Sequence, residues 1–250
     1  MSKLKQLQTK KGRDESGLFI VEGEKFVAEI PENYKIHSYY VSQKYADTHD
    51  LSLLKKRARV DVLSDKLFNE AASTITPQGI IAVCEQMRRQ ASNILTFGGF
   101  VLLCEEFGDP GNTGTLIRTA AAAGAGCVIL TKGSCELYNP KVIRSAAGAA
   151  LRLPIVQEAD INEVFRTLKE SRISIYAAHP RGDILPYKLD LKKDFCLMIG
   201  NEARGLSKTA INNADVLIRL PMANDTESLN ASAAGSILLY EAVRQRQDFM

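Results

Sequence analysis

The sequence predicts an α/β protein with a small N-terminal α/β domain and a larger C-terminal domain built on a parallel sheet. Two observations support this prediction. Short apolar runs alternate with helix-like stretches along the chain, and several runs after residue 100 are apolar throughout, as parallel strands buried on both faces are. A polar stretch ending in Gly98-Gly99 separates the halves. The domains are therefore predicted at 1–92 and 100–250, with a linker at 93–99.

The first domain contains four strand-like runs and three helix-like stretches. The predicted strands are residues 18–23, 36–41, 60–64 and 79–85. The predicted helices are residues 22–30, 44–58 and 64–72.

The second domain shows the alternation more clearly. The predicted strands are residues 100–107, 127–131, 173–178, 195–200 and 216–220. The predicted helices are residues 115–124, 140–148, 161–170, 207–214 and 228–246. Gly124 is a helix stop and Pro140 a helix start. This order predicts a parallel sheet covered by helices on both faces.

The composition is that of a globular protein, with 45% hydrophobic and 24% charged residues among 250. No apolar run approaches the ~18 residues of a membrane span, and the polar N-terminus lacks the apolar core of a signal peptide. The number of cysteines is odd and none has Cys-x-x-Cys spacing, which favours reduced thiols in the cytoplasm. The three histidines are scattered, so we expect no metal site.

The charge is concentrated near the N-terminus. The net charge is +3, and the whole surplus lies in residues 1–90. The first 13 residues carry five bases and no acid, and a second basic cluster lies at 55–59. A polyanion such as RNA, bound through Lys10, Lys11 and Arg13, is one interpretation. An ordinary solvated helix face is the other.

Three loops follow predicted strands at the edge where open parallel sheets bind ligands. The first has Gly108, Gly111 and Gly114, which could expose backbone N–H groups to an anion at a helix start. Asn112 is placed in this loop and Arg118 in the following helix, both toward the sheet edge. The glycine spacing differs from the dinucleotide fingerprint, and the chain has no P-loop. A plain strand–helix turn with a surface arginine is the alternative.

The second loop runs from a buried strand into Gly200, Asn201-Glu202 and Gly205. It places a carboxylate beside exposed backbone, with Ser207 as a predicted helix N-cap. A tight turn with a solvated glutamate is the alternative.

The third loop begins at Pro221, which ends a strand, and leads into the long closing helix. Ser228 and Asn230 lie where that helix begins, and Ser228 is a candidate N-cap. Small residues at 231, 234 and 235 give the helix a face that packs on its own sheet or on another copy.

Taken in order, the three loops resemble the motifs of the SpoU/TrmH class of RNA ribose 2′-O-methyltransferases, a branch of the SPOUT superfamily. The matching stretches are DPGNTGTLIRTA, IGNEARGLS, and LPM followed five residues later by SLNASAA. FIVEGEKFVAEI and ITPQGIIAVCE are similar to the family's substrate-binding domain. Asn224 stands where the third motif usually has glycine. Asparagine tolerates a left-handed backbone, so we expect the loop to keep its shape.

The resemblance implies a deep trefoil knot in the C-terminal domain, and a homodimer formed through that domain. It also implies methyl transfer from S-adenosyl-L-methionine to a ribose 2′-hydroxyl in RNA, without metal. The cofactor-binding residues it points to are Ile199, Gly200, Leu220, Met222, Ser228 and Leu229. The catalytic residues it points to are Asn112, Arg118, Glu202, Ser228 and Asn230.

The resemblance places Arg118 at the hydroxyl. Because arginine keeps its proton, we expect it to stabilise the developing alkoxide rather than act as a free base. Asn112 would orient the ribose or phosphate, and Glu202 and Asn230 would hold Arg118 and the loop. The separate N-terminal domain favours rRNA over tRNA as substrate. A catalytically silent RNA-binding or ribosome-assembly protein is the rival, and such a protein would be expected to have lost some of the five polar residues.

Overall fold

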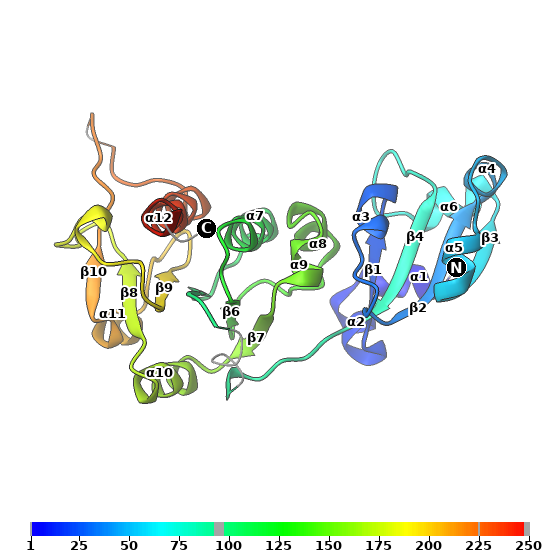
Figure 1. Cartoon of the computed structure of the whole chain (residues 1–250). Coiled ribbons are helices and arrows are strands. Elements are labelled where there is room, and N and C mark those ends of the chain that lie inside the picture. Colours follow the sequence, from blue (N-terminus) through cyan, green and yellow to red (C-terminus); the bar gives the residue numbers. More distant parts are fainter. Residues whose placement is uncertain (1, 93–97, 225, 248–250) are drawn as a thin grey trace. The chain divides into compact units, whose positions relative to one another are not determined.

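The computed structural model describes residues 2–92, 98–224 and 226–247, which form two compact units (Figure 1). The first unit combines Met1–Met87 with Glu136–Arg152, and the second combines Arg88–Cys135 with Leu153–Met250. Most of the predicted linker, residues 93–97, lies outside the described residues. The domain boundaries stay a prediction. No sequence pattern indicates that a segment inside the predicted second domain belongs to the first unit.

The first unit is built on a mixed sheet with the strand order β1-β4-β2-β3. Strand β4 is antiparallel to both of its neighbours, whereas β2 and β3 are parallel. Its strands are β1 (Leu18–Glu22), β2 (Ile36–Ser42), β3 (Arg59–Leu63) and β4 (Ile80–Glu85). All four strand predictions for this half are therefore confirmed.

The helices of the first unit agree less closely with the predictions. The described helices before residue 88 are α1 (Ser2–Leu7), α2 (Lys10–Ser16), α3 (Glu24–Ala28), α4 (Gln43–Thr48), α5 (Ser52–Arg57) and α6 (Asp65–Ala71). The single helix predicted at 44–58 is wrong: His49 is extended, and the Asp50 carboxylate accepts the Ser52 N–H at 2.9 Å in a local turn. Helices α1 and α2 were not predicted, because two leucines, Leu4 and Leu7, mark the buried face of α1 and a charged residue, Arg13, that of α2.

The segment Glu136–Arg152 carries α8 (Pro140–Ser145) and α9 (Ala149–Arg152). The helix predicted at 140–148 ends early because Ala147 and Gly148 have left-handed backbones, with φ of 46° and 75°. Tyr138 attaches this segment to the rest of the first unit. Its ring lies 4.4 Å from that of Phe19, and its hydroxyl donates to the Met87 carbonyl at 2.8 Å.

The second unit is built on a parallel sheet with the strand order β10-β8-β9-β5-β6-β7. Its strands are β5 (Val101–Cys104), β6 (Cys127–Thr131), β7 (Ile155–Ala159), β8 (Ser174–Ala178), β9 (Phe195–Ile199) and β10 (Val216–Ile218). The predicted parallel sheet is confirmed, whereas β7 was not predicted. The trefoil knot stays a prediction.

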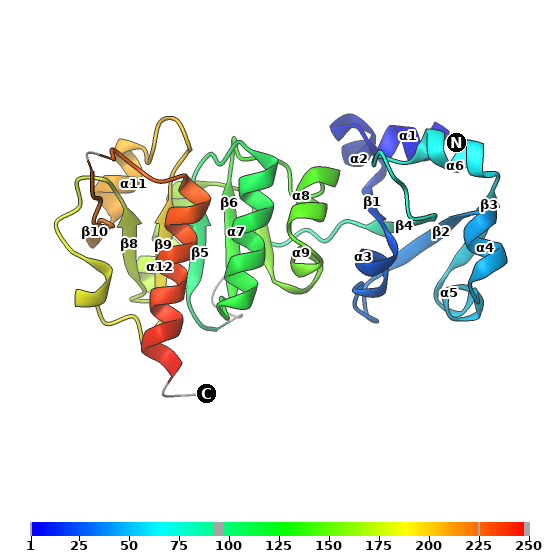
Figure 2. The same cartoon turned by 90° about the horizontal axis from the view of Figure 1, so that it is seen from above.

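Helices cover both faces of this second sheet, as predicted. Helices α7 (Pro110–Ala122) and α12 (Ala231–Arg246) lie side by side on one face (Figure 2), and α10 (Ile161–Glu170) and α11 (Lys208–Asn213) lie on the other (Figure 1). A short 3₁₀ helix, η2, spans Pro186–Lys188. A Cβ on Gly235 would lie 2.7 Å from Leu116 Cδ2, so at this position the small face of α12 packs within its own unit. No helix among the described residues is long and apolar enough to cross a membrane.

Candidate active site

Helix α7 begins five residues earlier than predicted. The Asp109 side chain caps it by accepting the Asn112 N–H at 2.8 Å, and Pro110 takes the first helical position. Gly111, Asn112 and Gly114 therefore belong to the helix, so the prediction of a glycine loop around Asn112 is wrong. The sequence carried the signal for this in Asp109-Pro110, a capping residue followed by proline.

Asn112 lies in a polar network that joins all three motifs. Its Nδ2 donates to Glu202 Oε1 at 3.3 Å, and its Oδ1 accepts from Asn230 Nδ2 at 3.3 Å. The Glu202 carboxylate also accepts the backbone N–H groups of Gly108 and Asp109, both at 3.2 Å. Ser232, which the sequence reasoning missed, donates to Asn112 Oδ1 at 3.2 Å.

Asn230 also corrects the start of α12. It is the N-cap, accepting the N–H groups of Ser232 and Ala233, so the helix begins at Ala231 rather than at 228. The prediction that Ser228 is the N-cap is therefore wrong. Ser228 lies in the preceding segment, where it is exposed.

Arg118 lies apart from this network. It is exposed on α7 and makes no hydrogen bond or ion pair with a described residue. Arg118 and Asn112 lie six residues apart on the same helix. At 3.6 residues per turn, this spacing directs their side chains about 120° apart around the helix axis. Glu202 and Asn230 contact Asn112 and not Arg118, so they hold the start of α7 but not Arg118.

A cavity of about 600 Å³, in the size range of small-molecule sites, is lined by the second and third motifs. All six residues predicted to bind the cofactor line it: Ile199, Gly200, Leu220, Met222, Ser228 and Leu229. Glu202 and Asn230 line it as well, whereas Asn112 and Arg118 do not. The sequence reasoning missed His179 and Arg181, which follow β8 and also line the cavity.

One wall of the cavity is residues 200–206, which we call the closed turn. The Asn201 N–H donates to the Gly205 carbonyl at 3.1 Å, and the Gly205 N–H donates back at 2.8 Å. A Cβ on Gly200 would lie 2.3 Å from the Gly205 carbonyl carbon, so only glycine fits there. The turn leads into α11, whose N-cap is Ser207 as predicted, accepting the Ala210 N–H at 3.1 Å.

A second wall comes from residues 219–229, which we call the open segment; its lining residues are Leu220, Met222, Glu227, Ser228 and Leu229. Within its described part, the structure shows one internal backbone hydrogen bond, from the Thr226 N–H to the Ala223 carbonyl at 3.2 Å. Met222 and Leu229 are each 39% exposed. Asn224 has φ of 54°, which confirms that it takes a left-handed backbone. This combination fits an adenosyl ligand. Backbone groups that are not hydrogen-bonded can pair with the polar edge of the adenine ring, and aliphatic side chains can cover its faces.

The predicted RNA contacts have different surroundings. Lys10 and Lys11 are exposed on α2, with Asp14 and Glu15 at 2.8 and 3.8 Å. Arg13 is buried, with a side chain 2% exposed, and its Nε and Nη2 donate to the Glu136 carboxylate at 2.7 and 2.5 Å. Phosphate cannot reach it, so the prediction of an RNA contact at Arg13 is wrong: it holds the segment Glu136–Arg152 within the first unit.

Burial makes two of the cysteines, Cys84 and Cys127, poor candidates for a reactive thiolate. All five cysteines are thiols, and burial raises the pKa of Cys84 and Cys127 to about 12, which disfavours thiolates. The described residues contain no group of three or more His, Cys, Asp or Glu side chains that could hold a metal ion.

The family models match both parts of the chain. Residues 99–240 match the SpoU rRNA methylase family, and residues 1–82 match the MRM3-like substrate-binding domain. The chain therefore belongs to the SpoU rRNA methylase family. The predicted family and enzyme class are confirmed.

The particular relatives agree with this assignment. The chain is 31% identical over 236 residues to the 23S rRNA (guanosine(2553)-2′-O)-methyltransferase RlmP of Bacillus subtilis, covering 94% of this chain and 92% of RlmP. It is 31% identical over 194 residues to the 23S rRNA (uridine(2479)-2′-O)-methyltransferase of Streptomyces viridochromogenes, covering 75% of this chain and 68% of that protein.

Solved structures agree over nearly the whole chain. The SpoU methyltransferase AviRb of Streptomyces viridochromogenes, in complex with AdoMet, superposes with a TM-score of 0.88 at 28% identity, covering 99% of this chain and 98% of AviRb. An AdoMet-bound rRNA methyltransferase of Sinorhizobium meliloti also gives 0.88, at 27% identity, covering 100% and 94%. The predicted α/β fold class is thereby confirmed, and both of these neighbours carry AdoMet.

Proposed function

We propose that this protein transfers a methyl group from S-adenosyl-L-methionine to a ribose 2′-hydroxyl of ribosomal RNA. The observation that carries the proposal is the cavity lined by the closed turn and the open segment, because all six residues predicted to bind the cofactor line it. The relatives support the substrate class, since both are named 23S rRNA 2′-O-methyltransferases.

Side chains and backbone groups of the cavity walls would contact different parts of the cofactor. Aliphatic side chains such as Ile199, Leu220 and Leu229 would enclose the adenine faces, and backbone groups of the open segment would bond its edges. Bound S-adenosylmethionine supplies an activated methyl group on a sulfonium sulfur, and the leaving group is a neutral thioether. The protein then needs to orient the ribose and stabilise charge on its 2′ oxygen.

The polar residues have proposed roles that follow from their contacts. Asn112 is held by Glu202 and Asn230, so it presents its amide in a fixed orientation and would bond the ribose or a neighbouring phosphate. Ser228 lines the cavity and would hold the cofactor or the ribose. Arg118 would stabilise the alkoxide that forms as the hydroxyl loses its proton.

We further propose that Arg118 serves the cavity of a second copy in a homodimer. In the chain described here, Arg118 lies outside the cavity lining and has no partner among the described residues. The neighbouring helix α12 exposes Ile237 (48%) and Tyr240 (53%) on one stripe. An apolar stripe beside an unpaired catalytic cation fits an interface that completes the site.

The first unit is the proposed RNA-binding part, acting in the cytoplasm. The matched family model for residues 1–82 is described as a substrate-binding domain. Lys10 and Lys11 remain the proposed phosphate contacts, because their side chains are 59% and 84% exposed. The buried thiols fit a reducing compartment.

Mapping 2′-O-methyl groups in RNA tests the function. Ribosomal RNA from cells with and without the gene should differ at one ribose, and the purified protein should restore that methyl group with S-adenosylmethionine alone. A missing methyl group in tRNA, with rRNA unchanged, would contradict the proposed substrate. No transfer to any RNA from deficient cells would contradict the reaction.

Complementation between two inactive variants tests the dimer. Gly200→Val should disable the cavity and Arg118→Ala the alkoxide stabilisation, so each homodimer should be inactive. A mixed dimer would combine one intact cavity with one intact Arg118 from the other copy. Activity that returns after the variants exchange subunits supports the shared site, and persistent inactivity in a verified mixed dimer contradicts it.

Salt dependence tests the RNA contacts. Changing Lys10 and Lys11 together to Ala should lower the slope of log affinity against log salt by roughly 0.7 per lost contact on single-stranded RNA. Changing Lys55 and Lys56 is the matched control on the second basic cluster. An unchanged slope for the first pair would mean that α2 is a solvated face.

A further inference from the structure

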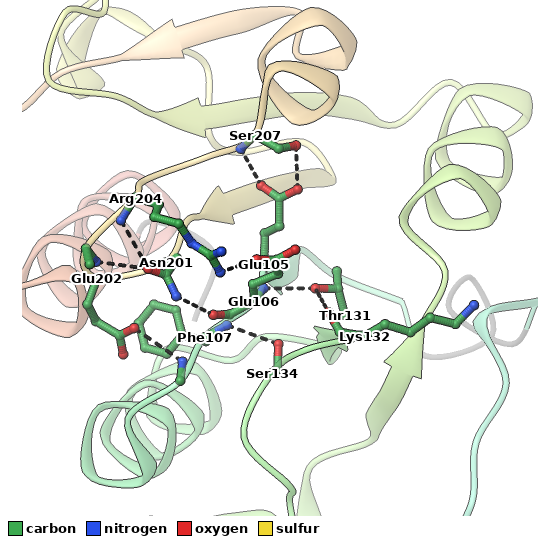
Figure 3. A network of polar contacts seen from close by, with 12 residues as sticks. Glu105, Glu106, Phe107, Thr131, Lys132, Ser134, Asn201, Glu202, Arg204 and Ser207 are labelled. Atoms are coloured by element: carbon green, nitrogen blue, oxygen red, sulfur yellow. Dashed lines mark hydrogen bonds and ion pairs between the residues drawn. The ribbon is translucent and has the colours of Figure 1, made fainter.

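The segment that follows β5 contacts the closed turn directly (Figure 3). Glu105 is buried, at 6% exposure, and its carboxylate accepts the Ser207 N–H at 2.8 Å and the Ser207 hydroxyl at 2.6 Å. A buried carboxylate is costly unless it is hydrogen-bonded, so this pairing fixes Ser207 firmly. Ser207 is the residue at which the closed turn enters α11.

Glu106 holds the same turn nearer its tip. Its carbonyl accepts from Asn201 Nδ2 at 2.7 Å, and its carboxylate accepts from the Arg204 guanidinium (Figure 3). Asn201 Oδ1 in turn accepts the N–H groups of Ala203 and Arg204 at 3.0 and 3.1 Å. Glu106 reaches this position with a left-handed backbone, at φ of 48°.

The segment 105–107 is itself anchored on its other side. The Glu106 N–H donates to Thr131 Oγ1 at 2.9 Å, and the Phe107 N–H donates to Ser134 Oγ at 3.1 Å. The Cys135 N–H donates to the Phe107 carbonyl at 2.6 Å. The segment that contacts the closed turn is therefore itself held by hydrogen bonds to the end of β6 and the loop that follows it.

We infer that Glu105 is a positioning residue for the cofactor, acting through the closed turn. This inference rests on the proposed function of the cavity. The turn is fixed at its start because Ile199 belongs to β9, which pairs with β5, and it is fixed at its end by the Glu105–Ser207 bonds. With both ends fixed, the cavity wall between them is preorganised, which lowers the ordering cost of ligand binding.

Glu105 and Glu106 should contribute unequally. The Glu106–Arg204 ion pair joins side chains that are 47% and 70% exposed, and exposed pairs contribute little. The Glu105 bonds are shielded from water, so their loss leaves the Ser207 N–H without its acceptor. We therefore expect loss of the Glu105 side chain, rather than that of Glu106, to displace the closed turn.

Calorimetry with S-adenosylhomocysteine on the full-length protein tests the inference. At a temperature where each variant is folded, Glu105→Ala should raise the Kd on the order of tenfold. Glu105→Gln should fall between wild type and Ala, because one amide oxygen still accepts the Ser207 N–H. Glu106→Gln should change the Kd by less than about fivefold. Glu158→Gln, at an exposed glutamate on β7, is the matched control and should match wild type.

Thermal unfolding of the same variants separates positioning from stability. A structural role alone would lower the unfolding midpoint of Glu105→Ala and leave its Kd for S-adenosylhomocysteine at the wild-type value. That result would overturn the inference and leave the proposed function standing. If wild type itself binds no S-adenosylhomocysteine, the proposed function fails first.

Discussion

The two walls of the cavity differ in how completely their own backbone is bonded. In the closed turn, the backbones of Asn201 and Gly205 are hydrogen-bonded to each other. Further hydrogen bonds join the turn and the adjacent Ser207 to the segment after β5. The open segment, in its described part, has one internal backbone bond. In the proposed site, the closed turn would therefore keep its shape without a ligand, and the open segment would offer its backbone donors and acceptors to the ligand. Such a site would combine one preorganised wall, the closed turn, with one wall that adapts to the ligand, the open segment.

The difference follows from where each wall leaves the sheet. The closed turn follows β9, which lies between β8 and β5 in the sheet interior, and Gly200 and Gly205 permit its tight path. The open segment follows β10, the edge strand of the sheet, which pairs with β8 and, through a single bridge, with Ile184. Pro221 has no N–H group, so the chain there cannot extend a ladder.

The largest expected effect is in the closed turn. Gly200→Val should abolish measurable S-adenosylhomocysteine binding in calorimetry, because the new Cβ would lie 2.3 Å from the Gly205 carbonyl carbon and 2.4 Å from the Leu206 nitrogen. From the sequence, we would expect this side chain to occupy the cofactor's own space. The structure gives a different cause: the side chain forces the turn itself apart.

Gly205→Asn is the matched control in the same turn. A Cβ at Gly205 meets nothing within 4 Å, and asparagine tolerates its φ of 69°. This variant should bind within a few-fold of wild type. Equal loss of binding in both variants would contradict the packing argument at Gly200.

Arg118→Ala should give the next largest effect, on catalysis alone. Loss of one preorganised charged group typically costs ~10²–10³ in rate. Because Arg118 lies outside the cavity lining, S-adenosylhomocysteine affinity should stay close to wild type. Arg118→Lys should also fail, since an ammonium cannot replace the planar guanidinium. Single-turnover methylation measures this, with the exposed Arg166→Ala on α10 as control.

Near-wild-type turnover in Arg118→Ala would remove Arg118 from the mechanism. Weakened cofactor binding in that variant would instead mean that Arg118 contacts the cofactor.

The smallest expected effect lies in the open segment. Asn224→Gly should leave S-adenosylhomocysteine affinity nearly unchanged, because glycine adopts the left-handed backbone readily. Asn224→Ala should weaken binding by less than about tenfold, since the left-handed conformation costs alanine roughly 1 kcal/mol. A loss as large as that of Gly200→Val would mean that the open segment is as rigid as the closed turn.

The sequence predicted the second sheet well because its strands are short, apolar throughout and bounded by clear turn signals. It missed β7, whose Gln157 and Glu158 interrupt the apolar pattern. It also missed α1 and α2, where two leucines are buried in an otherwise polar stretch. The assignment of Glu136–Arg152 to the first unit depends on Arg13–Glu136 and Phe19–Tyr138, pairs too distant in sequence for any local pattern to show.

For the site, motif resemblance predicted which residues line the cavity better than it predicted their partners. Ile199, Gly200 and Leu229 line it as expected. The bond between Asn112 and Glu202 joins residues 90 apart, and the Glu105–Ser207 contact joins residues 102 apart. Such pairings depend on how the strands are ordered in the sheet, and hydrophobic periodicity carries no information about that order.

Amide hydrogen exchange with and without S-adenosylhomocysteine tests the contrast between the two walls most directly. Without ligand, residues 200–206 should exchange slowly and residues 220–224 and 227–229 quickly. Saturating ligand should slow the open segment on the order of tenfold or more, and change the closed turn little. Fast exchange in the closed turn without ligand, or no protection of the open segment with it, would contradict the account.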